Sequence, residues 1–244
     1  MVRAKVLAIR LDQGELDPAA RATERHLCAG YLTLAESYTR PRHPHLLIVC
    51  GVSGSGKSCL SCLLREALPL IHLRSDVERK RLFGLDEKAQ TLSSVDSGIY
   101  FPSATNWTYD RLHRLADGIL ANGYDVLVDA TFIARDRRER FMQLARKHRA
   151  AFAILALDAP IDVLRQRLRH RLALGEDASE ADLAVLERQL ALRQCLSEVE
   201  KPYAVMVDST DTPPIGEILA SVEAVLGRMP DAISSASRSS EVLV

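Results

Sequence analysis

Residues 51–58 constrain the fold of this chain more than any other segment does. They read Gly-Val-Ser-Gly-Ser-Gly-Lys-Ser and match the pattern G-x-x-x-x-G-K-[ST]. An all-apolar run of strand length, residues 46–50, comes directly before the match, and a segment with helical spacing of apolar residues follows it. A buried strand, a glycine-rich turn and a helix in this order predict a loop that binds phosphate groups.

Each type of residue in this loop has a chemical role in binding phosphate. The glycines allow the backbone to curl so that consecutive N–H groups point inward at a β-phosphate, and the helix that follows adds its positive N-terminal end. We expect Lys57 to bridge the β- and γ-phosphates and the Ser58 hydroxyl to bind Mg²⁺. The residues expected to line the ATP site are Gly51, Val52, Ser53, Gly54, Ser55, Gly56, Lys57, Ser58 and Cys59.

The rest of the chain alternates strand-like and helix-like segments. Short apolar runs predict five strands, and amphipathic segments between them predict helices. The expected strands are residues 46–50, 70–73, 125–129, 152–157 and 203–207. This alternation predicts an α/β fold in which a five-stranded parallel sheet is the middle of three α/β/α layers. We expect the second strand to lie beside the first, and a long loop to follow over residues 84–104.

Composition and proline positions divide the chain into three parts. Residues 1–44 are expected to form a helical leader that ends at two prolines, and residues 45–228 the phosphate-binding domain. A lid is expected within that domain over about residues 165–195. Residues 229–244 contain five serines and are expected to be disordered.

Composition also argues against several classes of partner. The 32 basic and 32 acidic side chains cancel, so net charge supplies no field that would attract long nucleic acid or an anionic membrane. No apolar run approaches the roughly 20 residues of a membrane span, and the N-terminus lacks a signal-peptide core. Five cysteines, an odd number without an extracellular cue, indicate reduced thiols. We therefore expect a cytoplasmic protein.

Asp129 ends the third expected strand and is the first candidate for a metal ligand. Ligands of a parallel sheet bind at the carboxyl ends of its strands, so this carboxylate should hold Mg²⁺ together with Ser58, directly or through water. Thr131 would point to the same side and is a weaker candidate. The alternative is that Asp129 only caps the next turn.

Asp76 follows the second expected strand and is the candidate general base. At the carboxyl edge of the sheet, near the γ-phosphate, a carboxylate can accept the proton of an attacking hydroxyl group. Arg79, one helical turn further on, is expected to hold an anionic group of the acceptor. The alternative is an N-cap aspartate followed by a solvated basic helix.

Four arginines alternate along the expected lid helix. Because residues four apart share a helix face, Arg167 and Arg171 lie on one face and Arg165 and Arg169 on another. Two arginines on one face, beside the break expected at Gly175, suit a lid that closes over ATP and neutralises charge in the transition state. The alternative is an arginine-rich helix exposed to solvent.

Other polar residues carry weaker signals. Cys59 and Cys62 form a C-x-x-C pair without a second ligand pair, so we interpret them as small side chains that pack the helix. The basic run of residues 135–140 is interleaved with acids and is interpreted as surface. Three residues are candidate acceptor contacts, with packing as an equal alternative: Tyr100, Asn106 and Tyr109.

Taken together, these residues resemble a small P-loop kinase of the AAA_33 type, in the group of polynucleotide 5′-kinases, gluconate kinase, chloramphenicol phosphotransferase and zeta-toxin-like kinases. The resemblance covers roughly residues 45–227. It is carried by residues 51–58, the Ser75-Asp76 pair with Arg79, residues 128–131, residues 164–171 and residues 177–182. It implies a nucleoside-monophosphate-kinase-like fold, Asp76 as base, and contacts from Arg167 and Arg171 to the transferring phosphoryl group.

The chain is most similar to the kinase half of bacterial proteins that fuse an aminoglycoside-phosphotransferase-like domain to an ATP-binding domain. This similarity implies that residues 1–44 are a remnant of an upstream domain, which would then be encoded separately. The expected function is ATP- and Mg²⁺-dependent transfer of the γ-phosphate to a hydroxyl group of a small molecule. Two alternatives stay open: a polynucleotide 5′-hydroxyl kinase and a non-catalytic ATP-binding regulatory module.

Overall fold

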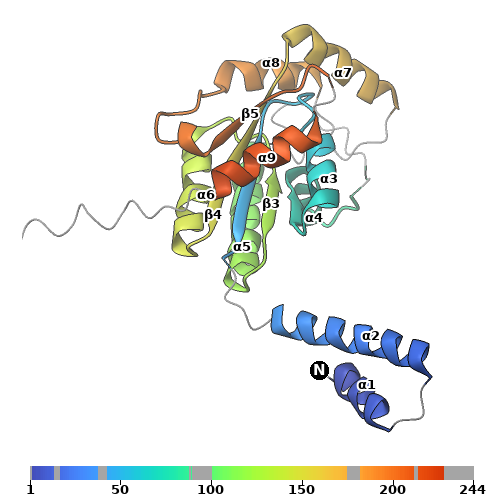
Figure 1. The fold of residues 1–244 in the computed structure, drawn as a ribbon. Coiled ribbons are helices and arrows are strands. Elements are labelled where there is room, and N and C mark those ends of the chain that lie inside the picture. The colour runs from blue at the N-terminus through green and yellow to red at the C-terminus, as the bar shows by residue number, and fades with distance from the viewer. Residues whose placement is uncertain are drawn as a thin grey trace, which may run out of the picture. The chain divides into compact units, whose positions relative to one another are not determined.

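The chain divides into two compact units, Met1–Arg42 and His43–Val244. The computed structural model describes residues 2–13, 17–37, 43–87, 89, 101–174, 182–211 and 214–227. The smaller unit is a hairpin of helices α1 (Val2–Asp12) and α2 (Pro18–Ser37), whose contact includes a hydrogen bond from Cys28 Sγ to the Ala4 carbonyl (Figure 1). The expected disorder of residues 229–244 lies outside the described residues.

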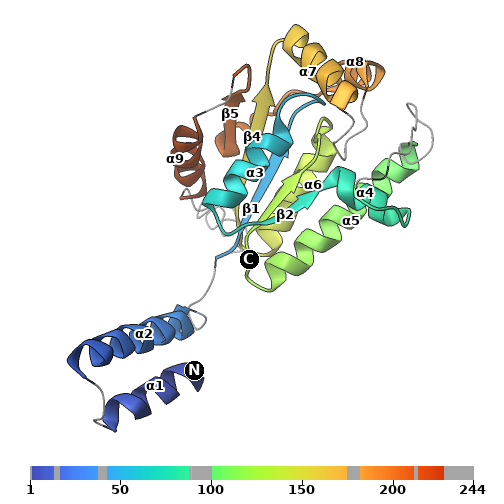
Figure 2. The same cartoon turned by 90° about the vertical axis from the view of Figure 1, so that its right-hand side faces the viewer.

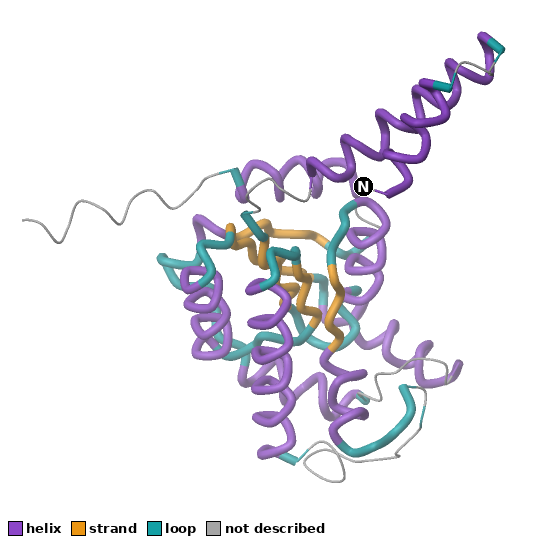
Figure 3. Tube along the Cα trace, turned by 90° about the horizontal axis from the view of Figure 1, so that it is seen from below, coloured by secondary structure: helices purple, strands orange, loops and turns teal. Residues whose placement is uncertain are grey.

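The larger unit is built on a five-stranded parallel sheet with the strand order β2-β3-β1-β4-β5. Its strands are β1 (His45–Cys50), β2 (Ile71–Arg74), β3 (Val126–Asp129), β4 (Ala151–Asp158) and β5 (Ala204–Asp208). Helices cover both faces of this sheet (Figure 2; Figure 3). The structure therefore confirms the predicted three-layer α/β/α fold.

Two apolar clusters hold the layers together. Helices α5 (Pro102–Ala121) and α6 (Arg135–Lys147) pack on one face of the sheet, and α3 (Lys57–Ala67) and α9 (Ile215–Leu226) pack on the other. Alternate residues of β1 point into the two clusters, which is why this strand is apolar throughout.

The position of β2 corrects one prediction from the sequence. We expected the second strand beside the first, but β3 lies between them and pairs with both. The burial of the strands accounts for this order, because all four residues of β3 are buried whereas β2 buries only Leu73. β2 therefore belongs at the edge of the sheet.

Three further helices surround the carboxyl ends of the strands. They are α4 (Ser75–Leu82), which directly follows β2, and the pair α7 (Ile161–Leu174) and α8 (Leu183–Leu192). α5 begins at Pro102, inside the segment predicted as a loop, and a short 3-10 helix, η2 (Lys201–Tyr203), precedes β5. Gly175, the expected break in the lid, lies outside the described residues. None of the helices in the described ranges is long and apolar enough to cross a membrane.

Candidate active site

The loop between β1 and α3 has the geometry of a phosphate-binding loop. Gly54 and Gly56 have φ angles of 83° and 80°, in the left-handed region that favours glycine, and Gly56 is the N-cap of α3. A Cβ atom at Gly51 would lie 2.5 Å from Ser55 Oγ, so the loop leaves no room for a side chain there. Ser55 Oγ is itself buried and has no hydrogen-bond partner among the described residues. These features fit a nest of backbone amides around an anion.

Lys57 lies over this loop. Its Nζ donates a hydrogen bond to the Val52 carbonyl at 2.8 Å. Burial lowers the pKa of the Lys57 ammonium below its ordinary value, and the negative charges of Asp129 and Asp76 oppose part of that shift. The charges of both carboxylates thus act on the lysine of this loop.

Ser58 and Asp129 meet where α3 begins and β3 ends. Ser58 Oγ donates to Asp129 Oδ2 at 2.9 Å, and His72 Nε2 lies 3.7 Å from the same oxygen. Burial favours the neutral form of Asp129, but the neighbouring His72, Lys57 and Ser58 outweigh it and hold the pKa below its ordinary value. A hydroxyl and an ionised carboxylate are hard oxygen donors, so these two residues fit Mg²⁺.

Asp76 lies on the first turn of α4, at the same edge of the sheet. Arg74, the last residue of β2, is in register with Asp129, the last residue of β3, so the two strands end level with each other. Asp76 lies two residues past the end of β2. The N-cap of α4 is Arg74, so Asp76 is not the cap of this helix. The alternative of a solvated basic helix is also wrong, because Glu78, Arg79 and Lys80 are buried. They are buried because α4 packs against α5.

Arg79 contributes to that packing. Its Nη1 donates to Thr105 Oγ1 of α5 at 3.3 Å, and the side chain is almost fully buried. Arg79 lies one helical turn beyond Asp76, as the sequence predicted. Its expected contact with an acceptor stays a prediction.

The two faces of α7 have different surroundings. Arg167 donates to the carbonyls of Ser209 at 2.6 Å and Thr210 at 3.0 Å. Its Nη1 is also close to the phosphate-binding loop, because a Cβ atom added at Gly56 would lie 3.9 Å from it. Arg171 lies close enough for its charge to lower the pKa of Lys57. On another face, Arg165 pairs with Glu187 of α8 at 2.7 Å. Arg167 therefore lies next to the phosphate-binding loop, and the closing of a lid by Arg167 and Arg171 stays a prediction.

The candidate acceptor contacts have separate surroundings. Tyr109 is buried, and its hydroxyl accepts a hydrogen bond from the Phe132 N–H at 3.0 Å and lies 3.3 Å from Thr131 Oγ1. Tyr109 and Thr131 thus stabilise the loop that follows β3. Asn106 Oδ1 accepts a hydrogen bond of 3.4 Å from Arg137. Tyr100 lies outside the described residues.

The cysteine pair on α3 is exposed. We interpreted Cys59 and Cys62 as small side chains that pack the helix, and the structure contradicts this, because both reach solvent. α3 uses Leu60, Ser61 and Leu64 for packing instead. The backbone N–H of Cys59 stays a predicted phosphate contact.

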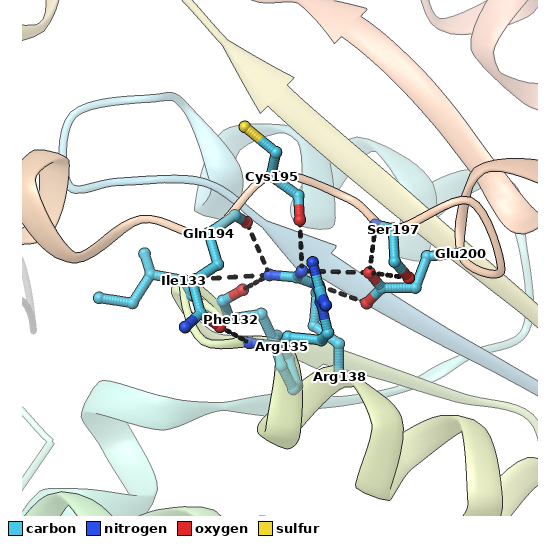
Figure 4. A network of polar contacts seen from close by, with 8 residues as sticks. All are labelled: Phe132, Ile133, Arg135, Arg138, Gln194, Cys195, Ser197 and Glu200. Atoms are coloured by element: carbon cyan, nitrogen blue, oxygen red, sulfur yellow. Dashed lines mark hydrogen bonds and ion pairs between the residues drawn. The ribbon is translucent and has the colours of Figure 1, made fainter.

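Sequence reasoning missed a buried ion pair between α6 and the segment that follows α8. Arg138 Nε donates to Glu200 Oε1 at 2.6 Å, and both residues are 1% exposed (Figure 4). We interpreted residues 135–140 as surface, but Arg138 lies on the same helix face as the buried Phe141 and Ala145, three and seven residues later. That spacing is the signal that would have found it.

A second residue that sequence reasoning missed is Gln189 of α8. Its Oε1 accepts a hydrogen bond of 2.7 Å from the backbone N–H of Ser53, inside the phosphate-binding loop. No local pattern marks this residue, because the two partners lie 136 positions apart.

Comparison with known proteins places this geometry in a family. The family model AAA_33, described as an AAA domain, matches residues 46–196. Uncharacterized proteins of Mycobacterium tuberculosis and Mycobacterium bovis are 29% identical over 194 residues, which cover 80% of this chain and 37% of theirs. The chain thus spans well under half the length of the curated relatives it matches.

Solved structures share the fold at low sequence identity. A proposed kinase of Chloroflexus aurantiacus superposes with a TM-score of 0.59 at 22% identity, covering 75% of this chain and 98% of that one. A gluconokinase of Sinorhizobium meliloti gives 0.51 at 22% identity, over 77% and 94%. The APS kinase of M. tuberculosis, solved with AMPPNP and APS, gives 0.51 at 19% identity, over 77% and 99%. The chain therefore belongs to the AAA_33 family and has the fold of a P-loop kinase.

Proposed function

We propose that this chain is an ATP- and Mg²⁺-dependent phosphotransferase that moves the γ-phosphate to a hydroxyl group of a small molecule. The observation that carries the proposal is the position of Asp76. It lies two residues beyond Arg74, the end of β2, which is in register with Asp129 at the end of β3. Its negative charge raises the pKa of Lys57 against the effect of burial. Transfer to a hydroxyl group requires a proton acceptor near the lysine that binds the γ-phosphate, and Asp76 would be that acceptor for Lys57.

The residues of the loop bind and orient the nucleotide in this proposal. Three backbone N–H groups of the loop donate within the protein, those of Gly51, Ser53 and Ser55. The N–H groups of Gly54 and of residues 56–59 would surround the phosphates, and Lys57 orients the γ-phosphate. Ser58 and Asp129 would hold Mg²⁺, which supplies positive charge that neutralises the phosphate oxygens. The neighbours of Asp129 keep its pKa low, so its carboxylate is ionised and can serve as a metal ligand.

The transfer itself requires one proton acceptor and several cations. Asp76 takes the proton of the acceptor hydroxyl while that oxygen forms its bond to the γ-phosphorus. The bond from the γ-phosphorus to the bridging oxygen breaks, and ADP leaves. Arg167 and Arg171 neutralise the charge on the transferring group, and Arg79 binds an anionic group of the acceptor.

The structural neighbours support this chemistry. The name of one is gluconokinase, and another was solved with the nucleotide analogue AMPPNP and with APS. A small-molecule acceptor also fits the zero net charge, which gives no general attraction for nucleic acid. All five cysteines are free, which fits the cytoplasmic location that we propose.

The experiment that tests the proposal identifies the phosphorylated product. The protein is incubated with γ-labelled ATP, Mg²⁺ and either a metabolite extract or oligonucleotides with 5′-hydroxyl ends, and labelled compounds are separated. We expect label in a small molecule, and none with the Lys57→Ala variant. Label in the oligonucleotide alone would indicate a polynucleotide 5′-kinase. No labelled product from either pool would favour a regulatory ATP-binding module.

A further inference from the structure

The peptide bond between Val52 and Ser53 is held from both of its edges. Its carbonyl accepts hydrogen bonds from Lys57 Nζ at 2.8 Å and from the Ser55 N–H at 3.2 Å. Its N–H donates to Gln189 Oε1 at 2.7 Å. Because the C=O and N–H of a trans peptide point in opposite directions, Lys57 and Gln189 fix the same plane from opposite sides.

Packing fixes the helix that carries Gln189. Leu186, one turn earlier on α8, is fully buried in an apolar cluster with Val52 of the loop and Leu164 and Leu168 of α7. Residues three apart on a helix share a face, so Gln189 is directed at the same loop. α8 therefore presents Gln189 to the loop from a fixed position.

The segment after α8 is fixed as well, by the buried ion pair. Arg138 donates to the carbonyls of Gln194 and Cys195 at 3.2 Å each, while Glu200 holds its guanidinium (Figure 4). The Gln194 side chain in turn accepts from the Arg135 N–H at 2.7 Å. A continuous set of contacts thus leads from α6 through α8 to the peptide that Lys57 contacts.

We propose that Gln189 is a positioning residue for phosphoryl transfer: it fixes the Val52–Ser53 peptide and, through the Val52 carbonyl, the ammonium of Lys57. The inference rests on the proposed function, in which Lys57 orients the γ-phosphate. The backbone amides at the start of α3 do not depend on this contact. Loss of Gln189 should therefore weaken binding of the γ-phosphate more than binding of the β-phosphate.

The test compares two nucleotides that differ in the γ-phosphate. Gln189→Met keeps the size of the side chain and removes the acceptor oxygen. We expect its Kd for ADP to stay within about twofold of wild type, and its Kd for AMPPNP to rise about five- to tenfold, the effect of one lost hydrogen bond. Gln189→Asn, which is one methylene shorter, should give the same pattern and serves if the first variant does not fold.

The matched control is Glu187→Gln, on the same helix but directed at α7. It should leave both dissociation constants unchanged. Equal weakening of both nucleotides by Gln189→Met, or no weakening of either, would overturn the positioning role. These binding measurements need no acceptor, so they stand even if the labelling experiment yields no phosphorylated product. Conversely, suppose that a labelled product is found but the ratio of the AMPPNP Kd to the ADP Kd is the same in Gln189→Met as in wild type. The phosphotransferase proposal would then stand, and only the role of Gln189 would be rejected.

Discussion

The hydroxyl of Ser58 lies 2.9 Å from the carboxylate of Asp129, although 71 positions separate the two residues. The contact follows from the pairing of β1 with β3, which brings the end of β3 beside the first turn of α3. Both oxygens therefore stand next to the phosphate-binding loop, where they would hold a divalent cation that supplies positive charge to a bound nucleotide.

Removal of either oxygen should abolish the effect of Mg²⁺ on nucleotide binding. Ser58→Ala and Asp129→Asn each take away one ligand, so ATP affinity should become nearly the same with Mg²⁺ and with EDTA. Titration of a fluorescent ATP analogue under the two conditions measures this. Thr131→Val is the control, because its hydroxyl contacts Tyr109, and it should keep the Mg²⁺ effect. A full Mg²⁺ effect in Asp129→Asn would exclude the proposed metal ligands.

The ion pair of Arg138 and Glu200 should be a major source of stability. Arg138→Met leaves the Glu200 carboxylate buried without its cation, and the free energy of unfolding should fall by about 3–5 kcal/mol. Urea denaturation followed by circular dichroism measures the change. Arg140→Met on the same helix removes the exposed pair with Asp110 and should cost less than about 1 kcal/mol. Equal losses in the two variants would contradict the structural role of Arg138.

Glu200 should also make the fold sensitive to acid. Burial raises the pKa of its carboxyl, but hydrogen bonds from Arg138 and Ser197 outweigh burial and hold the pKa below the ordinary 4.5. Because the pKa of Glu200 is lower in the folded state than in the unfolded state, its contribution to stability is fully present above the pKa of the unfolded state. That contribution is lost as the pH falls through the pKa of the folded state.

Glu200→Gln should therefore be less stable than wild type at neutral pH, and the difference should shrink as the pH falls below about 4.5. Unfolding free energies of the two proteins over this range measure it. A difference that is constant with pH would show that ionised Glu200 does not contribute the stability.

The local features of this fold could be predicted from the sequence, and the long-range ones could not. The loop over residues 51–58 and the buried strands depend on neighbouring residues, so pattern alone located them. Strand order depends on pairing between distant segments, and the edge position of β2 was missed. The burial of Arg138 was missed because it lies in a basic run, residues 135–140, of a kind that is usually exposed. The contact of Gln189 exists only because α8 packs on the loop.

The central claim is that the carboxylate of Asp76 accepts the proton of the acceptor hydroxyl beside a bound nucleotide. The most direct test measures, for wild type and Asp76→Asn, both AMPPNP affinity and the rate of label transfer from γ-labelled ATP to the small-molecule product. We predict affinities within about twofold of each other and transfer slowed by about a hundredfold or more in the variant, the usual contribution of a general base. A variant that transfers the phosphoryl group as fast as wild type would contradict the account.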